Sequence, residues 1–168
     1  MKNIILIGMP SAGKSTAGVI LAKNLGMSFV DTDVLIQTQE GRLLQEILNN
    51  EGAEKFLQIE EDSIVAMECE NTVIATGGSA VYSQKAMEHL KKNGTVLYIH
   101  IDMETVRRRL KNLKTRGVVL GSGQSLEDIY LQRQPLYEKY ADIKIDCSKY
   151  SIDSTVDILL KKIKILSK

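Results

Sequence analysis

The most constraining feature of this chain is a glycine-rich segment near its start. Residues 8–15 read Gly-Met-Pro-Ser-Ala-Gly-Lys-Ser, which fits the pattern G-x-x-x-x-G-K-S. Residues 2–7 before it form an apolar run, and residues 16–25 after it carry apolar side chains at helical spacing. We therefore expect a strand, a phosphate-binding turn and a helix whose positive end favours anions.

Each position of this turn has an expected role toward a nucleotide. Lys14 is placed to reach the β- and γ-phosphates, and the Ser15 hydroxyl is placed to coordinate Mg²⁺. The other nucleotide contacts expected from the turn are Ser11, Ala12, Gly13 and Thr16. The pattern thus predicts binding of a nucleotide with Mg²⁺, and it leaves open whether water, a protein or a metabolite accepts the phosphoryl group.

Strand-like and helical stretches alternate along the rest of the chain. Further short strands are expected at residues 28–31, 72–75, 95–99 and 142–145. Helical patterns occur at residues 34–39, 43–49, 53–70, 80–91, 103–110, 126–140 and 155–166. Five strands alternating with helices predict an α/β fold around a mainly parallel sheet, and 168 residues suit one domain, 1–168.

Two segments interrupt the alternation. The helices within residues 34–70 form a long excursion before the third strand, which we interpret as a substrate-binding helical region. Residues 112–124 contain Gly117, Gly121 and Gly123 among polar residues, which favours a mobile lid.

Composition narrows the class of partner. A net charge of +1 gives no field that would attract a nucleic acid, and no apolar run approaches the roughly 20 residues that span a bilayer. Cys69 and Cys147 lack the spacing of a metal site or a redox pair, which fits a reducing compartment. We expect a cytoplasmic monomer with a small-molecule substrate and neither nucleic-acid nor membrane partners.

Two carboxylates follow the second expected strand, in the sequence Asp31-Thr32-Asp33. Open α/β sheets bind ligands at the carboxyl ends of their strands, and a spacing of two in extended chain sends both side chains to one side. One carboxylate can then serve a metal and the other a substrate. The alternative for either is that it caps the following helix.

The chain resembles the shikimate kinase family over nearly its whole length. The matching segments are residues 8–16, Asp31-Thr32-Asp33, the stretch Gly52-Ala53-Glu54-x-Phe56-x-x-Ile59-Glu60, Ala75-Thr76-Gly77-Gly78, Thr115-Arg116 and Arg133-Gln134-Pro135-Leu136-Tyr137. The resemblance implies a P-loop kinase fold and transfer of the γ-phosphoryl group of ATP to shikimate, with Mg²⁺ present.

The resemblance also implies roles for individual residues. Asp31 matches the position that belongs to the magnesium network, and Asp33 matches the one that grips substrate hydroxyls and accepts the proton. Lid residue Arg116 matches an arginine that reaches the transferring phosphates. Gly77, Gly78 and Arg133 match positions that contact the substrate, and Arg133 matches the arginine that pairs with the shikimate carboxylate. Arg109 matches an arginine on the nucleotide side. The alternative for the basic stretch at residues 107–111 is the solvated face of a helix, and the same alternative holds for Arg133.

Three positions depart from the family pattern. Leu57 stands where the family usually has an arginine that also clamps the acceptor carboxylate, Ser79 ends the glycine triplet, and Gly117 follows Arg116 in place of proline. Losing a charged hydrogen bond typically costs roughly 1.5 to 3 kcal/mol. These departures leave open a related small-molecule or nucleoside-monophosphate kinase without a carboxylate on its acceptor. A separate alternative is a weakly catalytic nucleotide-binding regulator, which would have no use for a base such as Asp33.

Overall fold

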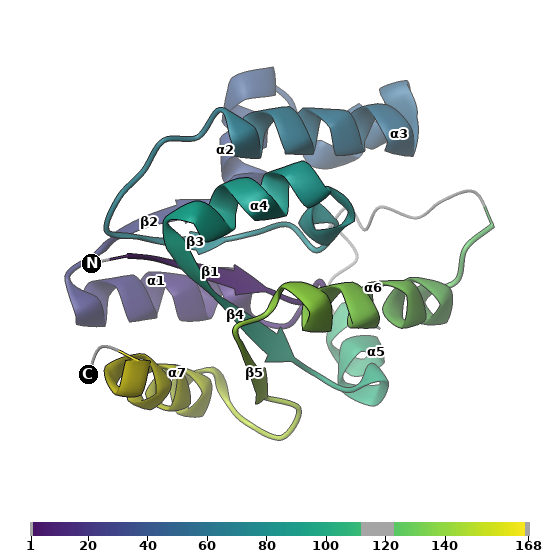
Figure 1. The fold of residues 1–168 in the computed structure, drawn as a ribbon. Coiled ribbons are helices and arrows are strands. Elements are labelled where there is room, and N and C mark those ends of the chain that lie inside the picture. The colour runs from purple at the N-terminus through teal and green to yellow at the C-terminus, as the bar shows by residue number, and fades with distance from the viewer. Residues whose placement is uncertain (1, 112–122, 167–168) are drawn as a thin grey trace.

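A single five-stranded sheet forms the centre of the protein. The computed structural model describes residues 2–111 and 123–166 (Figure 1). The strands are β1 (Asn3–Ile7), β2 (Ser28–Asp31), β3 (Thr72–Ala75), β4 (Gly94–His100) and β5 (Ile143–Asp146), in the order β2-β3-β1-β4-β5. Every pairing is parallel, which confirms the predicted α/β fold.

Helices cover both faces of this sheet (Figure 1). Helix α1 (Lys14–Leu25) packs with α7 (Ile152–Leu166) on one face. On the other face lie α4 (Gln84–Lys92) and α6 (Leu126–Tyr140), with α2 (Thr32–Glu40) and α3 (Leu44–Val65) stacked beyond α4. Helix α5 (Met103–Lys111) follows β4 and lies near α6.

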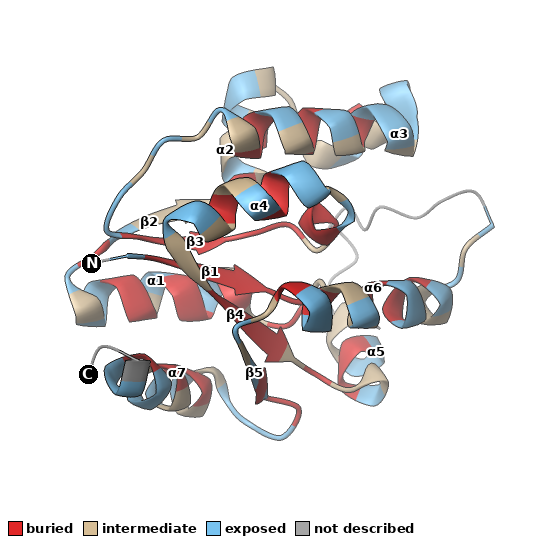
Figure 2. Cartoon of the chain, viewed as in Figure 1, coloured by how far each residue is buried: buried red, intermediate tan, exposed pale blue. Residues whose placement is uncertain are grey.

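The core has two parts. The main cluster surrounds β1, whose residues are all buried, as the strand of a sheet covered on both faces must be (Figure 2). A smaller cluster holds α2 and α3 together and is formed by Ile36, Ile47, Phe56 and Ile59. The predicted helical excursion therefore has a small core of its own.

Some helix boundaries differ from those expected. Gly52 has φ 82° and ψ 172°, so the helical patterns 43–49 and 53–70 join at a break, and the second ends at Val65. The pattern 80–91 is also divided, into a 3₁₀ turn, η1 (Ala80–Tyr82), and α4. Ser83 accepts a hydrogen bond from the Ala86 amide at 2.9 Å and so caps α4.

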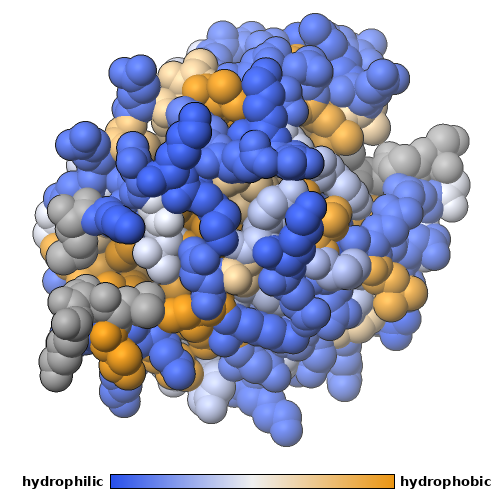
Figure 3. All heavy atoms as spheres, viewed as in Figure 1, coloured by the Kyte–Doolittle hydropathy of each residue, from blue (hydrophilic) through white to orange (hydrophobic). Residues whose placement is uncertain are grey.

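The surface is mostly polar, as expected for a chain in which 26% of the residues are charged. In the view of Figure 3 most of the surface is hydrophilic, and hydrophobic residues show in separate groups. Among the helices that the structure describes, none is long and apolar enough to cross a membrane.

Candidate active site

The glycine-rich turn between β1 and α1 has the backbone geometry that its sequence predicts. Gly8 has φ 147°, and a Cβ there would lie 2.5 Å from the carbonyl oxygen of Ile99. Gly13 has φ 89° and is the N-cap residue of α1. Ser11 adopts φ 68°, which is uncommon for a residue with a side chain and marks a backbone held in place by its surroundings.

Polar groups of this turn suit an anionic ligand. Lys14 is 7% exposed, and its Nζ donates to the carbonyl oxygens of Gly8 and Met9 at 2.8 and 2.9 Å. The buried Ser11 Oγ has no hydrogen-bond partner among the described residues. Because α1 begins at Lys14, its dipole adds positive potential at this point.

A cavity of about 410 Å³ opens beside the turn. It brings together most of the predicted site residues, which come from four separate parts of the chain: Ser11, Gly13, Lys14, Ser15, Asp31, Asp33, Gly77, Gly78 and Arg133. Ala12 is buried and Thr16 is exposed, and neither lines the cavity. Convergence of residues so far apart in sequence makes this cavity the candidate active site.

The two carboxylates after β2 have different surroundings. Asp31 Oδ1 accepts hydrogen bonds from the backbone amides of Asp33 and Val34, at 3.0 and 3.4 Å, and so caps α2. The capping alternative is therefore correct for Asp31, although its side chain also lines the cavity. Asp33 lies in the first turn of α2 and faces the same cavity.

The glycine pair after β3 forms a wall of the cavity where side chains would not fit. Gly77 donates its N–H to Thr32 Oγ1 at 3.0 Å. A Cβ on Gly78 would lie 2.8 Å from Pro10 Cδ and 2.9 Å from Arg133 Nη1. The Tyr137 hydroxyl donates to the Gly78 carbonyl at 2.6 Å, and burial raises the pKa of Tyr137, which keeps that hydroxyl protonated.

Arg133 is the largest fully buried side chain of the described protein and is only 1% exposed. Its Nε donates to the Tyr82 hydroxyl at 3.3 Å, and its guanidinium carbon lies 5.3 Å from the centre of the Tyr82 ring. The alternative of a solvated helix position is therefore wrong. A buried guanidinium beside a cavity is suited to an anionic group of a ligand.

Glu60, on α3, is a buried carboxylate whose place at this site the sequence reasoning did not identify. It is 2% exposed and accepts a hydrogen bond from Ser79 Oγ at 2.6 Å. Burial raises the pKa of Glu60 to about 7, and the Ser79 hydrogen bond opposes this shift. The sequence carried one signal: Phe56, Ile59, Glu60, Ser63 and Ile64 share the buried helical face.

Arg109 lies at the other side of the phosphate-binding turn. Its Nη1 donates to the Ser11 carbonyl at 3.1 Å, whereas Arg107 pairs with Glu127 on the surface. The solvated-face alternative therefore fits Arg107 and not Arg109. Arg109 borders a second hollow of about 400 Å³ rather than the main cavity.

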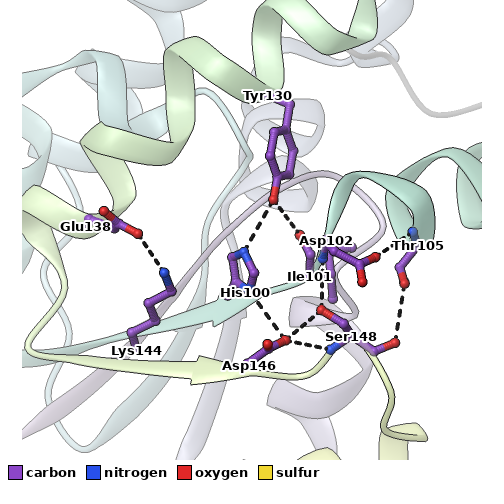
Figure 4. A network of polar contacts seen from close by, with 9 residues as sticks. All are labelled: His100, Ile101, Asp102, Thr105, Tyr130, Glu138, Lys144, Asp146 and Ser148. Carbon is purple, nitrogen blue, oxygen red and sulfur yellow. Dashed lines mark hydrogen bonds and ion pairs between the residues drawn. The ribbon is translucent and has the colours of Figure 1, made fainter.

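A polar network fixes the end of β4 from which α5 starts (Figure 4). The Tyr130 hydroxyl lies 3.3 Å from His100 Nε2 and 3.2 Å from the Ile101 carbonyl. Ser148 accepts from the Asp102 amide at 2.9 Å and donates to Asp146 at 2.6 Å. The network joins α6 and the end of β5 to the start of the helix that carries Arg109.

The predicted lid, residues 112–124, lies outside the described residues except for Gly123 and Gln124. Arg116 and Gly117 are thus also outside them.

Comparison with known proteins agrees with this geometry. The family model for shikimate kinase matches residues 10–164. The chain belongs to the shikimate kinase family. It is 36% identical to a shikimate kinase from Sulfurihydrogenibium over 165 residues, which cover 98% of this chain and 99% of the relative. A shikimate kinase from Thiobacillus denitrificans is 34% identical, over 98% of this chain and 91% of its own length.

Solved structures show the same relationship. The shikimate kinase from Acinetobacter baumannii in complex with shikimate is 30% identical, with a TM-score of 0.87 over 97% of this chain and 93% of that one. The shikimate kinase from Aquifex aeolicus is 27% identical, with a TM-score of 0.79 over 98% of both chains. The P-loop kinase fold implied by the family resemblance is confirmed.

Proposed function

We propose that this protein is a shikimate kinase that transfers the γ-phosphoryl group of ATP to the 3-hydroxyl of shikimate. The observation that carries the proposal is one cavity with a phosphate-binding turn and a buried arginine among its lining residues. A donor phosphate at Lys14 and an acceptor carboxylate at Arg133 would place a hydroxyl near Asp33. Shikimate is the ligand of a solved relative 30% identical to this chain.

Catalysis in this proposal consists of positioning and charge stabilisation. Lys14, and Arg116 from the predicted lid, neutralise charge on the transferring phosphoryl group. Asp33 orients the acceptor hydroxyl and takes its proton. Gly77 and Gly78 let the acceptor approach the backbone.

The oxygen donors beside the turn fit Mg²⁺. Ser15 supplies a hydroxyl and Asp31 a carboxylate, and both line the cavity. Mg²⁺ in phosphoryl-transfer sites takes one or two protein oxygens together with phosphate oxygens and water. Within the described residues no cluster of three His, Cys, Asp or Glu could hold a metal. Ser15 and Asp31 would therefore hold the ion together with oxygens of the nucleotide. When bound, it neutralises charge on the β- and γ-phosphates.

Leu57 is the feature that favours a second candidate, a related kinase whose acceptor lacks a carboxylate. Its side chain is half-buried on α3 and packs against the smaller core cluster. It supplies no positive charge, so Arg133 is the one cavity-lining arginine among the described residues. Arg133 would pair with one anionic group of the acceptor, which is the carboxylate in shikimate and the phosphate group in a nucleoside monophosphate.

A turnover screen decides between these candidates. We expect ATP consumption with shikimate and not with gluconate or nucleoside monophosphates, measured by coupled ADP release and by mass spectrometry of the product. Lys14→Ala should abolish transfer without unfolding the protein and is the control for contaminating kinases. Turnover with a nucleoside monophosphate alone would overturn the shikimate assignment, and ADP release without an acceptor would indicate a nucleotide-binding regulator.

The proposal also includes a cytoplasmic monomer. Light scattering of the purified protein at micromolar concentration should give a mass near 18.7 kDa.

A further inference from the structure

Two of the departures from the family pattern, Leu57 and Ser79, can be related to one buried carboxylate, Glu60. Leu57 precedes Glu60 by three residues on α3, and positions three apart on a helix are neighbours. Ser79 donates to Glu60 Oε2 from the opposite side, at 2.6 Å. Where the family pattern has arginine and glycine, this chain has leucine and serine. An arginine at position 57 could donate to Glu60 across one turn of the helix, and in this chain the Ser79 hydroxyl is the donor.

Glu60 stands directly behind the acceptor wall of the cavity. A Cβ placed on Gly77 would collide with Glu60 Oε1 and would lie 2.7 Å from Asp33 Oδ1. The carboxylates of Glu60 and Asp33 therefore both border the space where a side chain of Gly77 would lie. A rotation of the Glu60 side chain would therefore disturb Gly77 in the cavity wall and Asp33, the residue proposed to orient the acceptor hydroxyl.

Few groups hold this carboxylate. Glu60 Oε1 is buried and has no hydrogen-bond partner among the described residues, and Oε2 is held by the Ser79 hydroxyl. The charges of Arg133 and Lys14 act on Glu60 without a hydrogen bond to it among those described. A buried polar group with one donor depends strongly on that donor.

Among the described residues, Glu60 is the one hydrogen-bond partner of the Ser79 hydroxyl, and Ser79 also lines the cavity. Ser79 precedes the 3₁₀ turn η1 but forms no side-chain cap there. The turn is closed by the backbone, since the Tyr82 amide donates to the Ser79 carbonyl at 2.9 Å. The side chain is 4% exposed and points to Glu60.

We propose that Ser79 is a positioning residue for the acceptor, because its hydroxyl holds the Glu60 carboxylate. Leucine at position 57 cannot donate a hydrogen bond to Glu60, whereas an arginine there could. Positions 57 and 79 are therefore coupled through Glu60. The proposal deepens the proposed function and rests on it for the identity of the acceptor. The coupling between the two positions can be measured separately.

A double-mutant cycle on Leu57→Arg and Ser79→Ala tests the coupling. Ser79→Ala alone should raise the shikimate KM about five- to tenfold, and Leu57→Arg alone should lower it about tenfold, from a recovered carboxylate contact. In the Leu57→Arg background, Ser79→Ala should change the KM by less than about twofold. Equal effects of Ser79→Ala in both backgrounds would overturn the proposal.

Matched variants separate positioning from a general effect on folding. Ser83 donates to Glu61 at 2.6 Å in a second serine–glutamate pair, which lies outside the cavity. Ser83→Ala should leave both substrate KM values unchanged, as should Glu61→Gln. Ser79→Thr keeps the hydroxyl and should retain more of the wild-type shikimate KM than Ser79→Ala. The ATP KM should stay constant throughout the cycle.

A substrate-independent measurement distinguishes failure of this inference from failure of the proposed function. The Ser79 hydrogen bond lowers the pKa of Glu60, so Ser79→Ala should raise it in a carboxyl NMR titration. The same substitution should shift it much less in the Leu57→Arg background. A wild-type protein inactive on shikimate would refute the proposed function, whereas equal NMR shifts in both backgrounds would refute the coupling itself.

Discussion

Arg109 donates a hydrogen bond from Nη1 to the main-chain carbonyl of Ser11 at 3.1 Å, across 98 positions of sequence. This contact joins α5 to the phosphate-binding turn. Since the polar network around His100 and Ser148 fixes the start of α5, the position of the arginine is set by the ends of β4 and β5 and by α6 (Figure 4). The turn is therefore supported from outside its own strand and helix.

Arg109→Ala should weaken nucleotide binding. The variant loses a positive charge beside the turn and a charge-assisted hydrogen bond to its backbone, so we expect the ATP KM to rise about tenfold, equivalent to about 1.4 kcal/mol. The shikimate KM should not change. Arg107→Ala is the matched control, because Arg107 pairs with Glu127 at the surface. Similar ATP KM values for the two variants would remove Arg109 from the nucleotide site.

Asp33→Asn should lose turnover and keep nucleotide affinity. An amide cannot accept the proton of the acceptor hydroxyl, so we expect kcat to fall at least about a hundredfold, the usual scale of a general base. Calorimetry with a non-hydrolysable ATP analogue should give the wild-type Kd. A kcat within a few-fold of wild type would show that Asp33 is not the base.

Asp31→Asn separates the helix cap that the structure shows for Asp31 from the magnesium role that we propose for it. Asparagine caps helices about as well as aspartate, so the free energy of unfolding should change little. The lost charge should raise the Mg²⁺ concentration for half-maximal activity, by about tenfold, with activity recovered at high Mg²⁺. Asp153→Asn, in the first turn of α7, serves as the control. An unchanged Mg²⁺ requirement would leave Asp31 with the cap alone.

The sequence predicts those parts of this protein whose contacts are local. The strand–turn–helix around Lys14 was predictable because the glycines set the backbone of the turn and the Lys14 side chain bonds carbonyls only five and six residues away. The sheet was predictable because strand-like stretches of four to seven residues alternate with helical patterns. Boundaries such as that at Ser83 were missed, since a single hydroxyl decides where α4 begins.

Contacts between distant elements could not be predicted in this way. Ser79 meets Glu60 across 19 positions, and Tyr137 meets the Gly78 carbonyl across 59. Both depend on how α3 and α6 pack against the loop after β3, which no periodicity specifies. Arg133 shows the same limit: a positive side chain on a helix is usually solvated, and only packing around Tyr82 shows that it is buried.

The buried Glu60 carboxyl should make stability depend on pH. Burial raises its pKa from an ordinary value of 4.5 to about 7, so the native state holds a proton that the unfolded state releases. The associated stability is fully present below about pH 4.5 and is lost as pH rises through about 7. The loss is on the order of 3 kcal/mol.

Glu60→Gln, which carries no charge at any pH, should remove this dependence. The free energy of unfolding from urea titrations at pH 4.5, 6 and 8 should fall less steeply with pH in the variant than in the wild type. Glu61→Gln is the control, because the Ser83 hydrogen bond lowers the pKa of Glu61 and its stabilising contribution appears as pH rises. Glu61→Gln should therefore make the free energy of unfolding fall more steeply with pH than in the wild type. Parallel curves for wild type and Glu60→Gln would mean that Glu60 stays ionised in the folded protein, with Arg133 and Lys14 compensating its burial.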